Sequence, residues 1–172
     1  MMANLTASDG HTLDCWMTEA QGTRRGGIVI LQEIFGVTDQ LKGVADRYAA
    51  LGYDIAIPAL FDRQEHGAVI PFDQAPRGRD LMLTANLDQT MIDIDAAIQA
   101  LRARGGKVGV IGHCSGGRQT FLAAVSLPLD AAVDCYGGAV VNPPPEGHPL
   151  HGIPALVNRA ADLSCPLLGL FG

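Results

Sequence analysis

Residues 112–117, Gly-His-Cys-Ser-Gly-Gly, combine types and a spacing that suit covalent chemistry. They follow the apolar run 107–111 and precede helix-forming residues, so the pattern predicts a strand, a tight turn and a helix. A nucleophile on such a strained turn projects from the end of a buried strand. Cys114 is the candidate nucleophile, because glycines two residues before and after it leave room for the turn.

Two other interpretations of this segment remain open. Ser115 could be the nucleophile, but centring the motif on Ser115 places His113 where the pattern needs a glycine. The segment could also be a glycine-rich turn that holds an incidental buried cysteine. The helix that starts here directs backbone N–H groups and its positive dipole end toward the cysteine sulfur, which favours a reactive role.

Glu33 is the second candidate, since it directly follows the apolar run 26–32. If the strands 26–32 and 107–111 are neighbours, their carboxyl ends meet and Glu33 lies at the same rim as Cys114. A carboxylate in this position is costly to bury unless it is hydrogen-bonded. A solvated loop carboxylate or a structural ion pair is the alternative for Glu33.

The elements that must position these residues follow from hydrophobic periodicity. Apolar or alternating runs predict strands at 12–17, 26–32, 53–58, 107–111, 131–136 and 165–171, the first of them at an edge of the sheet. Helical spacing covers 38–51 and 81–104, whereas 62–76 and the proline-rich 142–154 are predicted to be irregular. Strands that alternate with helices predict a mostly parallel sheet with helices on both faces.

The composition sets limits on the class of protein. A chain of 172 residues, 48% hydrophobic and 17% charged, fits a single globular domain over residues 1–172. The net charge is −6 and no basic run stands out, so nucleic acid and anionic membranes are not expected partners. The expected partner is a small molecule.

The cysteines are widely spaced, at positions 15, 114, 135 and 165, and form no C-x-x-C pair. Neither a metal site nor a disulfide framework is expected, and free thiols fit a reducing compartment. Residues 1–10 lack the apolar core of a signal peptide, and no run is long enough to span a membrane. We therefore expect a cytoplasmic, soluble protein. The short Gly-Gly pairs indicate no dinucleotide cofactor.

Two motifs together carry a family resemblance. Residues 32–36, Gln-Glu-Ile-Phe-Gly, and the downstream Gly-x-Cys-x-Gly-Gly resemble the dienelactone hydrolase (carboxymethylenebutenolidase) family of α/β-hydrolases. The likeness extends through 52–53, 58–61 and 136–138, and it covers nearly the whole chain. It implies the α/β-hydrolase fold. It also implies hydrolysis of an enol-lactone from aromatic-compound degradation, or of a related carboxylic ester.

The resemblance also implies roles for individual residues. Cys114 is similar to the nucleophile of the family, and Glu33 to the glutamate that holds the resting thiol and accepts its proton. A carboxylate beside a thiol disfavours the thiolate and so protects the free enzyme from oxidation. The backbone N–H groups of Ile34 and Ser115 would form the oxyanion hole.

Arginines of the family bind the carboxylate of the substrate, which predicts an anionic substrate. Arg77 and Arg79 lie in about the corresponding stretch. A guanidinium group presents two parallel N–H donors to a carboxylate. The alternative for either arginine is a solvated surface side chain. Arg118 follows the turn at Cys114 closely, and the sequence leaves open which way its side chain points.

The sequence departs from the family at its C-terminal end. The aspartate of the family follows a strand that resembles 165–172, and its histidine comes later, but neither lies within these residues. We therefore expect an incomplete domain that lacks its last strands and helices. The histidines at 11, 66, 113, 148 and 151 are expected at the surface or facing away from the thiol. The alternatives to a cysteine hydrolase are a catalytically inactive binding scaffold and a serine-type esterase of the same fold.

Overall fold

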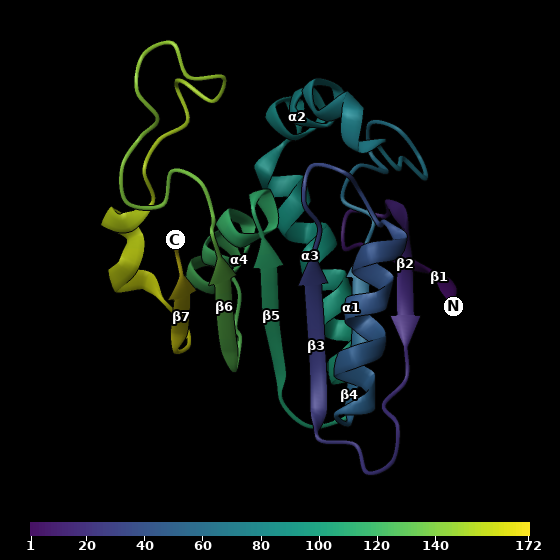
Figure 1. The fold of residues 1–172 in the computed structure, drawn as a ribbon. Helices are drawn as coiled ribbons and strands as arrows, with labels where there is room; N and C mark the ends of the chain where they lie inside the picture. Colours follow the sequence, from purple (N-terminus) through teal and green to yellow (C-terminus); the bar gives the residue numbers. More distant parts are fainter.

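A single seven-stranded sheet organises the chain. The computed structural model describes residues 1–172 and orders the strands β1-β2-β4-β3-β5-β6-β7 (Figure 1). The strands are β1 (Met2–Thr6), β2 (Thr12–Thr18), β3 (Gly26–Leu31), β4 (Tyr53–Pro58), β5 (Val108–His113), β6 (Ala131–Cys135) and β7 (Leu167–Leu170). Strands β3 to β7 are parallel, whereas β2 is antiparallel to β1 and β4. The prediction of a mostly parallel sheet is confirmed.

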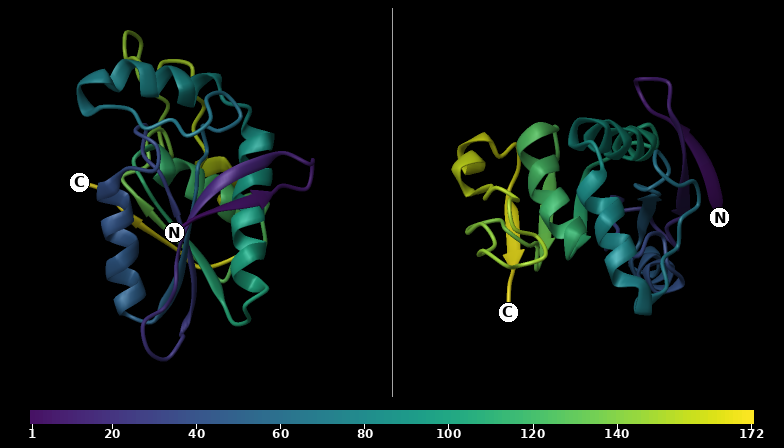
Figure 2. Two further views of the ribbon diagram at one scale, coloured as in Figure 1. Left: turned by 90° about the vertical axis from the view of Figure 1, so that its right-hand side faces the viewer. Right: turned by 90° about the horizontal axis from the view of Figure 1, so that it is seen from above.

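Helices cover both faces of the sheet, as predicted. They are α1 (Asp39–Ala50), α2 (Ala75–Thr84), α3 (Leu87–Arg102) and α4 (Ser115–Ser126), with short 3₁₀ turns at Phe72–Gln74 and Val157–Asp162. Helix α1 lies on one face, α3 and α4 lie on the other, and α2 lies beyond the carboxyl ends of the central strands (Figures 1 and 2). None of these helices has the length and apolarity needed to cross a membrane.

Helix α1 has the bounds that its sequence signals predict. Thr38 caps its N-terminus, with the hydroxyl accepting a hydrogen bond from Leu41 N–H at 3.2 Å. Leu41, Ala45 and Ala49 are buried against the sheet. Gly52 follows the last turn with φ +90°, a conformation that favours glycine and ends the helix.

The region 75–104 differs from the prediction of one helix over 81–104. Helix α2 begins at Ala75, inside the segment predicted to be irregular, and Pro76 is tolerated because its first turn needs no N–H donor. The chain then breaks, and Asn86 caps α3 by accepting a hydrogen bond from Gln89 N–H at 3.1 Å. The Asn86 cap was the local signal that separates the two helices.

The position of β2 was also predicted wrongly. It does not form the edge, because β1 pairs outside it with a register that runs from Met2↔Trp16 to Thr6↔Thr12. Strand β1 alternates exposed and half-buried residues and has no strong apolar run, so only its pairing identifies it. A tight turn with Gly10 at φ +87° closes this hairpin.

The core forms one layer on each side of the central strands. Val29 and Leu31 of β3 pack toward α3 and α4, where Leu101 is also fully buried. Ile30 faces the opposite way, into the layer that contains Ala45 of α1. A parallel strand covered on both faces has no polar side, which accounts for the continuous apolar run that precedes Glu33.

Candidate active site

The carboxyl ends of β3 and β5 bring the two candidate residues to one rim of the sheet. The strands are parallel neighbours, with Leu31 paired to Gly112. Glu33 and Cys114 each follow these paired positions by two residues, and both are partly buried. The parallel sheet thus places a carboxylate and a thiol at its carboxyl edge, where ligands bind in folds of this kind.

The turn at Cys114 has the strained geometry of a nucleophile elbow. Cys114 has φ 55° and ψ −117° at the start of α4, a backbone conformation that residues other than glycine rarely adopt. A Cβ atom on Gly112 would collide with the backbone of Gly116. A Cβ atom on Gly116 would collide with the carbonyl oxygen of Leu31. Both glycines are therefore required for the close approach of α4 to the strands.

Two backbone donors flank the thiol. Ile34 and Ser115 line the same cavity as Cys114, and the N–H group of Ile34 donates no hydrogen bond within the protein. An unpaired N–H group at this rim is available to an oxyanion. The Ser115 hydroxyl donates to the carbonyl oxygen of Gln32 at 3.4 Å, so this side chain is engaged with the backbone.

The surroundings of Cys114 keep its thiol protonated. Burial is the largest effect and raises the pKa of the thiol above its ordinary value. The Ser115 backbone N–H hydrogen bond lowers this pKa, and the negative charge of Glu33 raises it. Burial and the charge of Glu33 thus both disfavour the thiolate of Cys114.

The cavity at Cys114 has a volume of about 270 Å³. Arg79, Tyr136 and His148 line it together with Cys114, so one of the two predicted substrate-binding arginines is present. Arg77 does not line the cavity and instead forms an ion pair with Glu65.

Arg118 also lines this cavity, and its donors are occupied by a loop. Its guanidinium group donates to the carbonyl oxygens of Gly138 at 3.3 Å, Ala139 at 2.7 Å and Pro154 at 2.9 Å. Burial lowers the pKa of this side chain, and no carboxylate pairs with it. Arg118 therefore fastens both ends of the proline-rich segment to the elbow helix.

His148 was expected at the surface, but the structure places it in the cavity wall. Its Nδ1 atom accepts a hydrogen bond from Leu150 N–H at 3.0 Å, which leaves the proton of the neutral ring on Nε2. No hydrogen bond joins any histidine to the Cys114 sulfur. The sequence shows no periodicity in this loop, so its approach to the elbow could not be predicted.

His113 faces a separate small cavity of about 210 Å³, which Glu33 and Tyr136 also line. Burial lowers the pKa of His113, and the charge of Glu33 opposes this shift. The Nδ1 atom of His113 is buried without a hydrogen-bond partner. His113 does not line the Cys114 cavity, in line with the alternation of side chains along a strand.

Asp134 packs against the start of α4 at Gly117, a structural role that the sequence did not indicate. It is fully buried at the end of β6, and its Oδ1 atom accepts a hydrogen bond from Gly137 N–H at 2.9 Å. Burial raises the pKa of this carboxyl group, and the Gly137 hydrogen bond lowers it. A Cβ atom on Gly117 would collide with the Asp134 carboxylate, so the second glycine of the Gly-Gly pair also serves packing.

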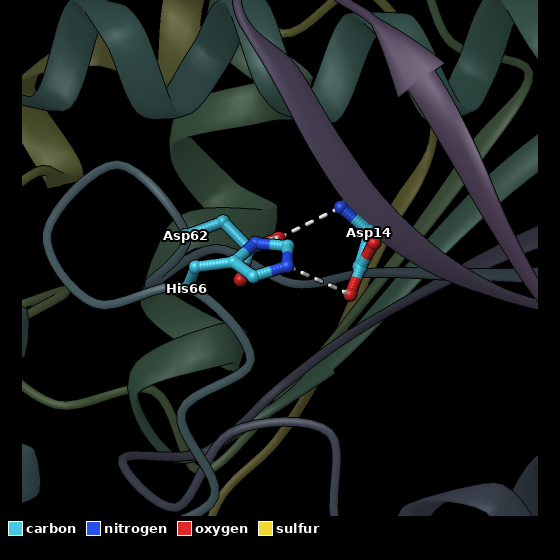
Figure 3. Close-up of side chains that lie close together, drawn as sticks. All are labelled: Asp14, Asp62 and His66. Atoms are coloured by element: carbon cyan, nitrogen blue, oxygen red, sulfur yellow. Dashed lines mark hydrogen bonds and ion pairs between the residues drawn. The ribbon is translucent and has the colours of Figure 1, made fainter.

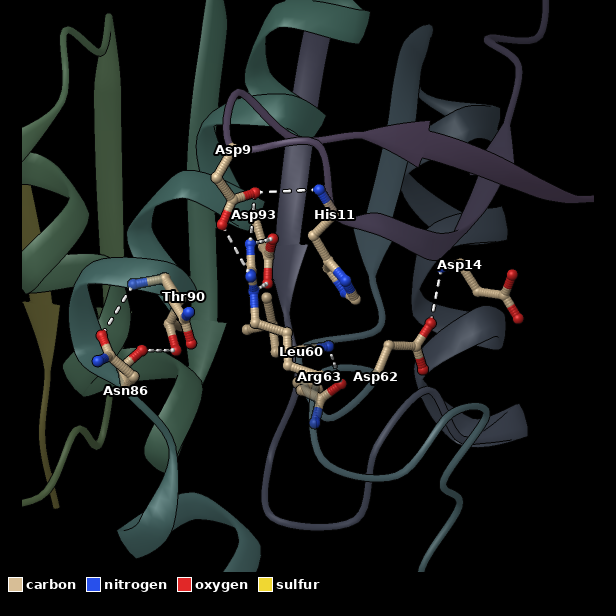
Figure 4. Close-up of polar contacts among 11 residues, drawn as sticks. Asp9, His11, Asp14, Leu60, Asp62, Arg63, Asn86, Thr90 and Asp93 are labelled. Carbon is tan, nitrogen blue, oxygen red and sulfur yellow. Dashed lines mark hydrogen bonds and ion pairs between the residues drawn. The ribbon is translucent and has the colours of Figure 1, made fainter.

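A second polar cluster lies away from Cys114 and was not predicted. Asp14, Asp62 and His66 place possible metal ligands within 4.8 Å of one another (Figure 3). Asp62 is buried and accepts a hydrogen bond from Asp14 N–H at 2.7 Å (Figure 4). It also accepts one from Gly67 N–H at 2.8 Å. Backbone N–H groups thus bind both oxygens of the Asp62 carboxylate. The cluster therefore has a structural role, because Asp62 joins β2 to the loop after β4.

A larger cavity, of about 460 Å³, lies elsewhere. Arg25, Lys107 and Asp130 line it at the amino ends of the strands, opposite the rim that holds Cys114. Ligands of parallel sheets bind beyond the carboxyl ends, so size alone does not make this cavity the candidate site.

Comparisons with known proteins agree with the motifs. The model of the dienelactone hydrolase family matches residues 13–172. A putative carboxymethylenebutenolidase of Methylorubrum extorquens is 33% identical over 157 residues, which cover 89% of this chain and 52% of the relative. The carboxymethylenebutenolidase of Pseudomonas putida is 33% identical over 140 residues, 78% of this chain and 59% of the relative. The chain thus spans about half the length of the curated relatives that it matches.

The solved structures give the same result for the fold. A putative dienelactone hydrolase from Klebsiella pneumoniae superposes with a TM-score of 0.77 at 26% identity, and the match covers 98% of this chain and 71% of that one. The dienelactone hydrolase-like promiscuous phosphotriesterase P91 from metagenomic libraries gives a TM-score of 0.67 at 22% identity, covering 100% and 82%. The predicted α/β-hydrolase fold is confirmed.

Proposed function

The chain belongs to the dienelactone hydrolase family, and from that premise we propose that it carries the nucleophile of a carboxylic ester or enol-lactone hydrolase. One observation supports this most directly. Cys114 is held on a strained turn and shares a cavity with two backbone donors, Ile34 N–H and Ser115 N–H. Strain of this kind costs about 1–3 kcal/mol and persists where the surrounding structure enforces it, often at functional sites.

The proposed reaction is acyl transfer through a thioester. Glu33 accepts the thiol proton, and the Cys114 sulfur attacks the carbonyl carbon of the substrate. The negative charge that forms on the carbonyl oxygen is stabilised by the N–H groups of Ile34 and Ser115. The C–O bond to the leaving group then breaks, the leaving oxygen takes the proton that Glu33 accepted, and water later hydrolyses the thioester.

We propose that the carboxylate of an anionic substrate binds Arg79. This arginine lines the Cys114 cavity, and it has no ion-pair partner within the protein. Arg77, the other arginine predicted for this role, is paired with Glu65 and does not line the cavity. The guanidinium group of Arg79 could donate two parallel hydrogen bonds to the carboxylate of such a substrate.

A scaffold that binds ligands without turnover is the second candidate. It is favoured by one observation, which is that no histidine is hydrogen-bonded to Cys114. Without a base to activate water, the acyl group would remain on the sulfur. The serine-type alternative is less favoured, because the Ser115 hydroxyl donates to Gln32 and Cys114 occupies the strained position.

The deciding experiment counts the nitrophenol released per chain from p-nitrophenyl acetate. Cys114→Ala is the test variant, and Cys165→Ala, which removes a partly buried cysteine outside the cavity, is its matched control. Release of many equivalents that only Cys114→Ala abolishes supports the hydrolase. Release of one equivalent, with the acetyl group retained on Cys114, supports the scaffold, and equal release by wild type and Cys114→Ala contradicts the nucleophile.

A further inference from the structure

A second cavity adjoins the one at Cys114. It has a volume of about 400 Å³ and lies between the α2–α3 connection, α4 and the end of the proline-rich loop. Four residues line both cavities, namely Met82, Ser115, Arg118 and Ile153. Ser115 directly follows Cys114 in the chain, so the two cavities meet next to the sulfur.

The two cavities differ in chemistry. The first holds the thiol together with Arg79, His148 and Tyr136. The second has no counterpart of Arg79: aliphatic side chains from three elements line it, among them Leu83 of α2, Leu87 of α3 and Leu122 of α4, together with the polar Gln119 and His151. A substrate that fills both cavities would therefore carry a polar group on one side of the reacting carbonyl and an apolar group on the other.

Arg118 is the only formally charged side chain in the lining of the second cavity. Its guanidinium group is bound by the carbonyl oxygens of Gly138, Ala139 and Pro154. The aliphatic stem of an arginine can then form part of an apolar wall while the head group is satisfied elsewhere.

Leu83 and Leu87 are 44% and 50% exposed, although they are large aliphatic residues. Scattered exposed leucines need no explanation, but these two converge on one cavity that adjoins the cavity of Cys114. Burial of an aliphatic group there would remove apolar surface from water on both the ligand and the protein.

We propose that this second cavity, lined by Leu83, Leu87 and Leu122, binds an apolar arm of the ester that acylates Cys114. The substrate class is then an ester with an extended hydrocarbon group and not a compact lactone alone. The inference rests on the proposed function for the reaction. Binding of the arm depends only on the thiol and the cavity, so it can be tested without turnover.

The test alkylates the intact chain with N-methylmaleimide and with N-cyclohexylmaleimide. The Cys114 sulfur adds to the C=C bond of the maleimide, and the neighbouring carbon takes a proton from water, so no group leaves. Second-order rates at Cys114 come from mass spectrometry of its tryptic peptide. The cyclohexyl-to-methyl rate ratio is divided by the same ratio for glutathione, which removes the intrinsic reactivity of the two reagents.

We expect a normalised ratio of about five or more in the wild type, since one buried methylene group corresponds to about fourfold. Leu83→Asn and Leu87→Asn should each lower it toward one. The matched control is Leu51→Asn, a leucine 58% exposed at the end of α1 and outside both cavities. All three side chains are exposed, so thermal melting should confirm that each variant folds.

A wild-type ratio near one, or a ratio that both cavity variants leave unchanged, overturns the proposal. A high ratio without acylation by p-nitrophenyl acetate supports the apolar cavity and contradicts the proposed function. Acylation by p-nitrophenyl acetate with a maleimide ratio near one supports the proposed function and contradicts the apolar cavity. If neither maleimide labels Cys114, the thiol is inaccessible and both proposals fail.

Discussion

Glu33 and Cys114 each stand two residues beyond a paired position, Leu31 with Gly112, on adjacent parallel strands. This register places both residues at the same rim of the sheet without any long-range loop. The negative charge of Glu33 contributes to the raised pKa of Cys114, although burial contributes more. Burial and the charge of Glu33 therefore both favour the protonated thiol.

The first prediction concerns the charge of Glu33. Glu33→Gln removes a negative charge near the sulfur, so the pKa of Cys114 should fall and the thiolate fraction at a fixed pH should rise. Alkylation by iodoacetamide below the thiol pKa should accelerate by up to about fivefold, which corresponds to about 1 kcal/mol of Coulomb energy. The alkylation rate should be measured from pH 6 to pH 10. The whole pH–rate profile of Glu33→Gln should lie at lower pH than that of the wild type.

Glu19→Gln is the matched control for this prediction, because Glu19 is exposed and pairs only with Arg104. Its profile should coincide with that of the wild type. An unchanged profile for Glu33→Gln, or a shift to higher pH, would mean that Glu33 does not act on the thiol through its charge.

The second prediction concerns the glycines of the elbow. Gly116→Ala places a methyl group against the carbonyl oxygens of Leu31 and Gln32, both of them backbone atoms that cannot rotate away. Helix α4 must then shift, and we expect the free energy of unfolding to fall by about 1–3 kcal/mol. Urea titration measures this loss.

Gly43→Ala is the opposite case within the same chain. Gly43 lies inside α1, is exposed, and has no atom within 4 Å of an added Cβ. Alanine should stabilise the helix by about 0.5–1 kcal/mol. If Gly116→Ala were as well tolerated as Gly43→Ala, the close approach of α4 to β3 would not be required.

These glycines show why much of the elbow could be predicted from the sequence. A tight turn needs glycine at fixed offsets, and a strand buried on both faces needs an unbroken apolar run, so both leave local patterns. The position of His148 has no such pattern. It depends on how the loop that contains it is fastened by Arg118, a residue thirty positions earlier in the chain.

The same distinction explains the two errors in the fold. Strand β1 exists because it pairs with Trp16 and its neighbours, and pairing cannot be read from five alternating residues. The break between α2 and α3 did leave a signal, the Asn86 cap, but the apolar spacing on both sides of it also fits one continuous helix.

The third prediction concerns the ion pair that fastens the loop after β4 to α3. Arg63 forms two 2.8 Å hydrogen bonds with the carboxylate of Asp93, which is 2% exposed, and it also pairs with Asp9 (Figure 4). Arg63→Ala leaves the Asp93 carboxylate buried without this partner, so the free energy of unfolding should fall by about 3–5 kcal/mol.

A double-mutant cycle isolates this pair. Asp93→Ala in the Arg63→Ala background should cost much less than in the wild type, because it then removes a carboxylate that has already lost its Arg63 partner. Glu19→Ala, which breaks an exposed pair with Arg104, should cost less than about 1 kcal/mol in the same urea titrations. Additive effects of the two core changes would show that Arg63 and Asp93 do not stabilise each other.

The fourth prediction concerns the hold of Arg118 on the loop that forms the cavity wall. The ends of this loop also meet through the backbone, since Val140 O accepts hydrogen bonds from Leu156 N–H and Val157 N–H, both at 2.9 Å. Arg118→Ala removes three charge-assisted hydrogen bonds from the same base. Hydrogen exchange at Leu156 and Val157 should accelerate roughly tenfold or more, because each such bond contributes about 1.5–3 kcal/mol.

The measurement must separate local opening from global unfolding. Amides in the middle of α3 report global unfolding, so their exchange should change less than that of Leu156. Arg118→Lys should restore little protection, because one ammonium group cannot reproduce the planar fork that reaches Gly138, Ala139 and Pro154 at once. Equal acceleration in α3 and in the loop would show that Arg118 stabilises the whole domain and does not fasten this wall in particular.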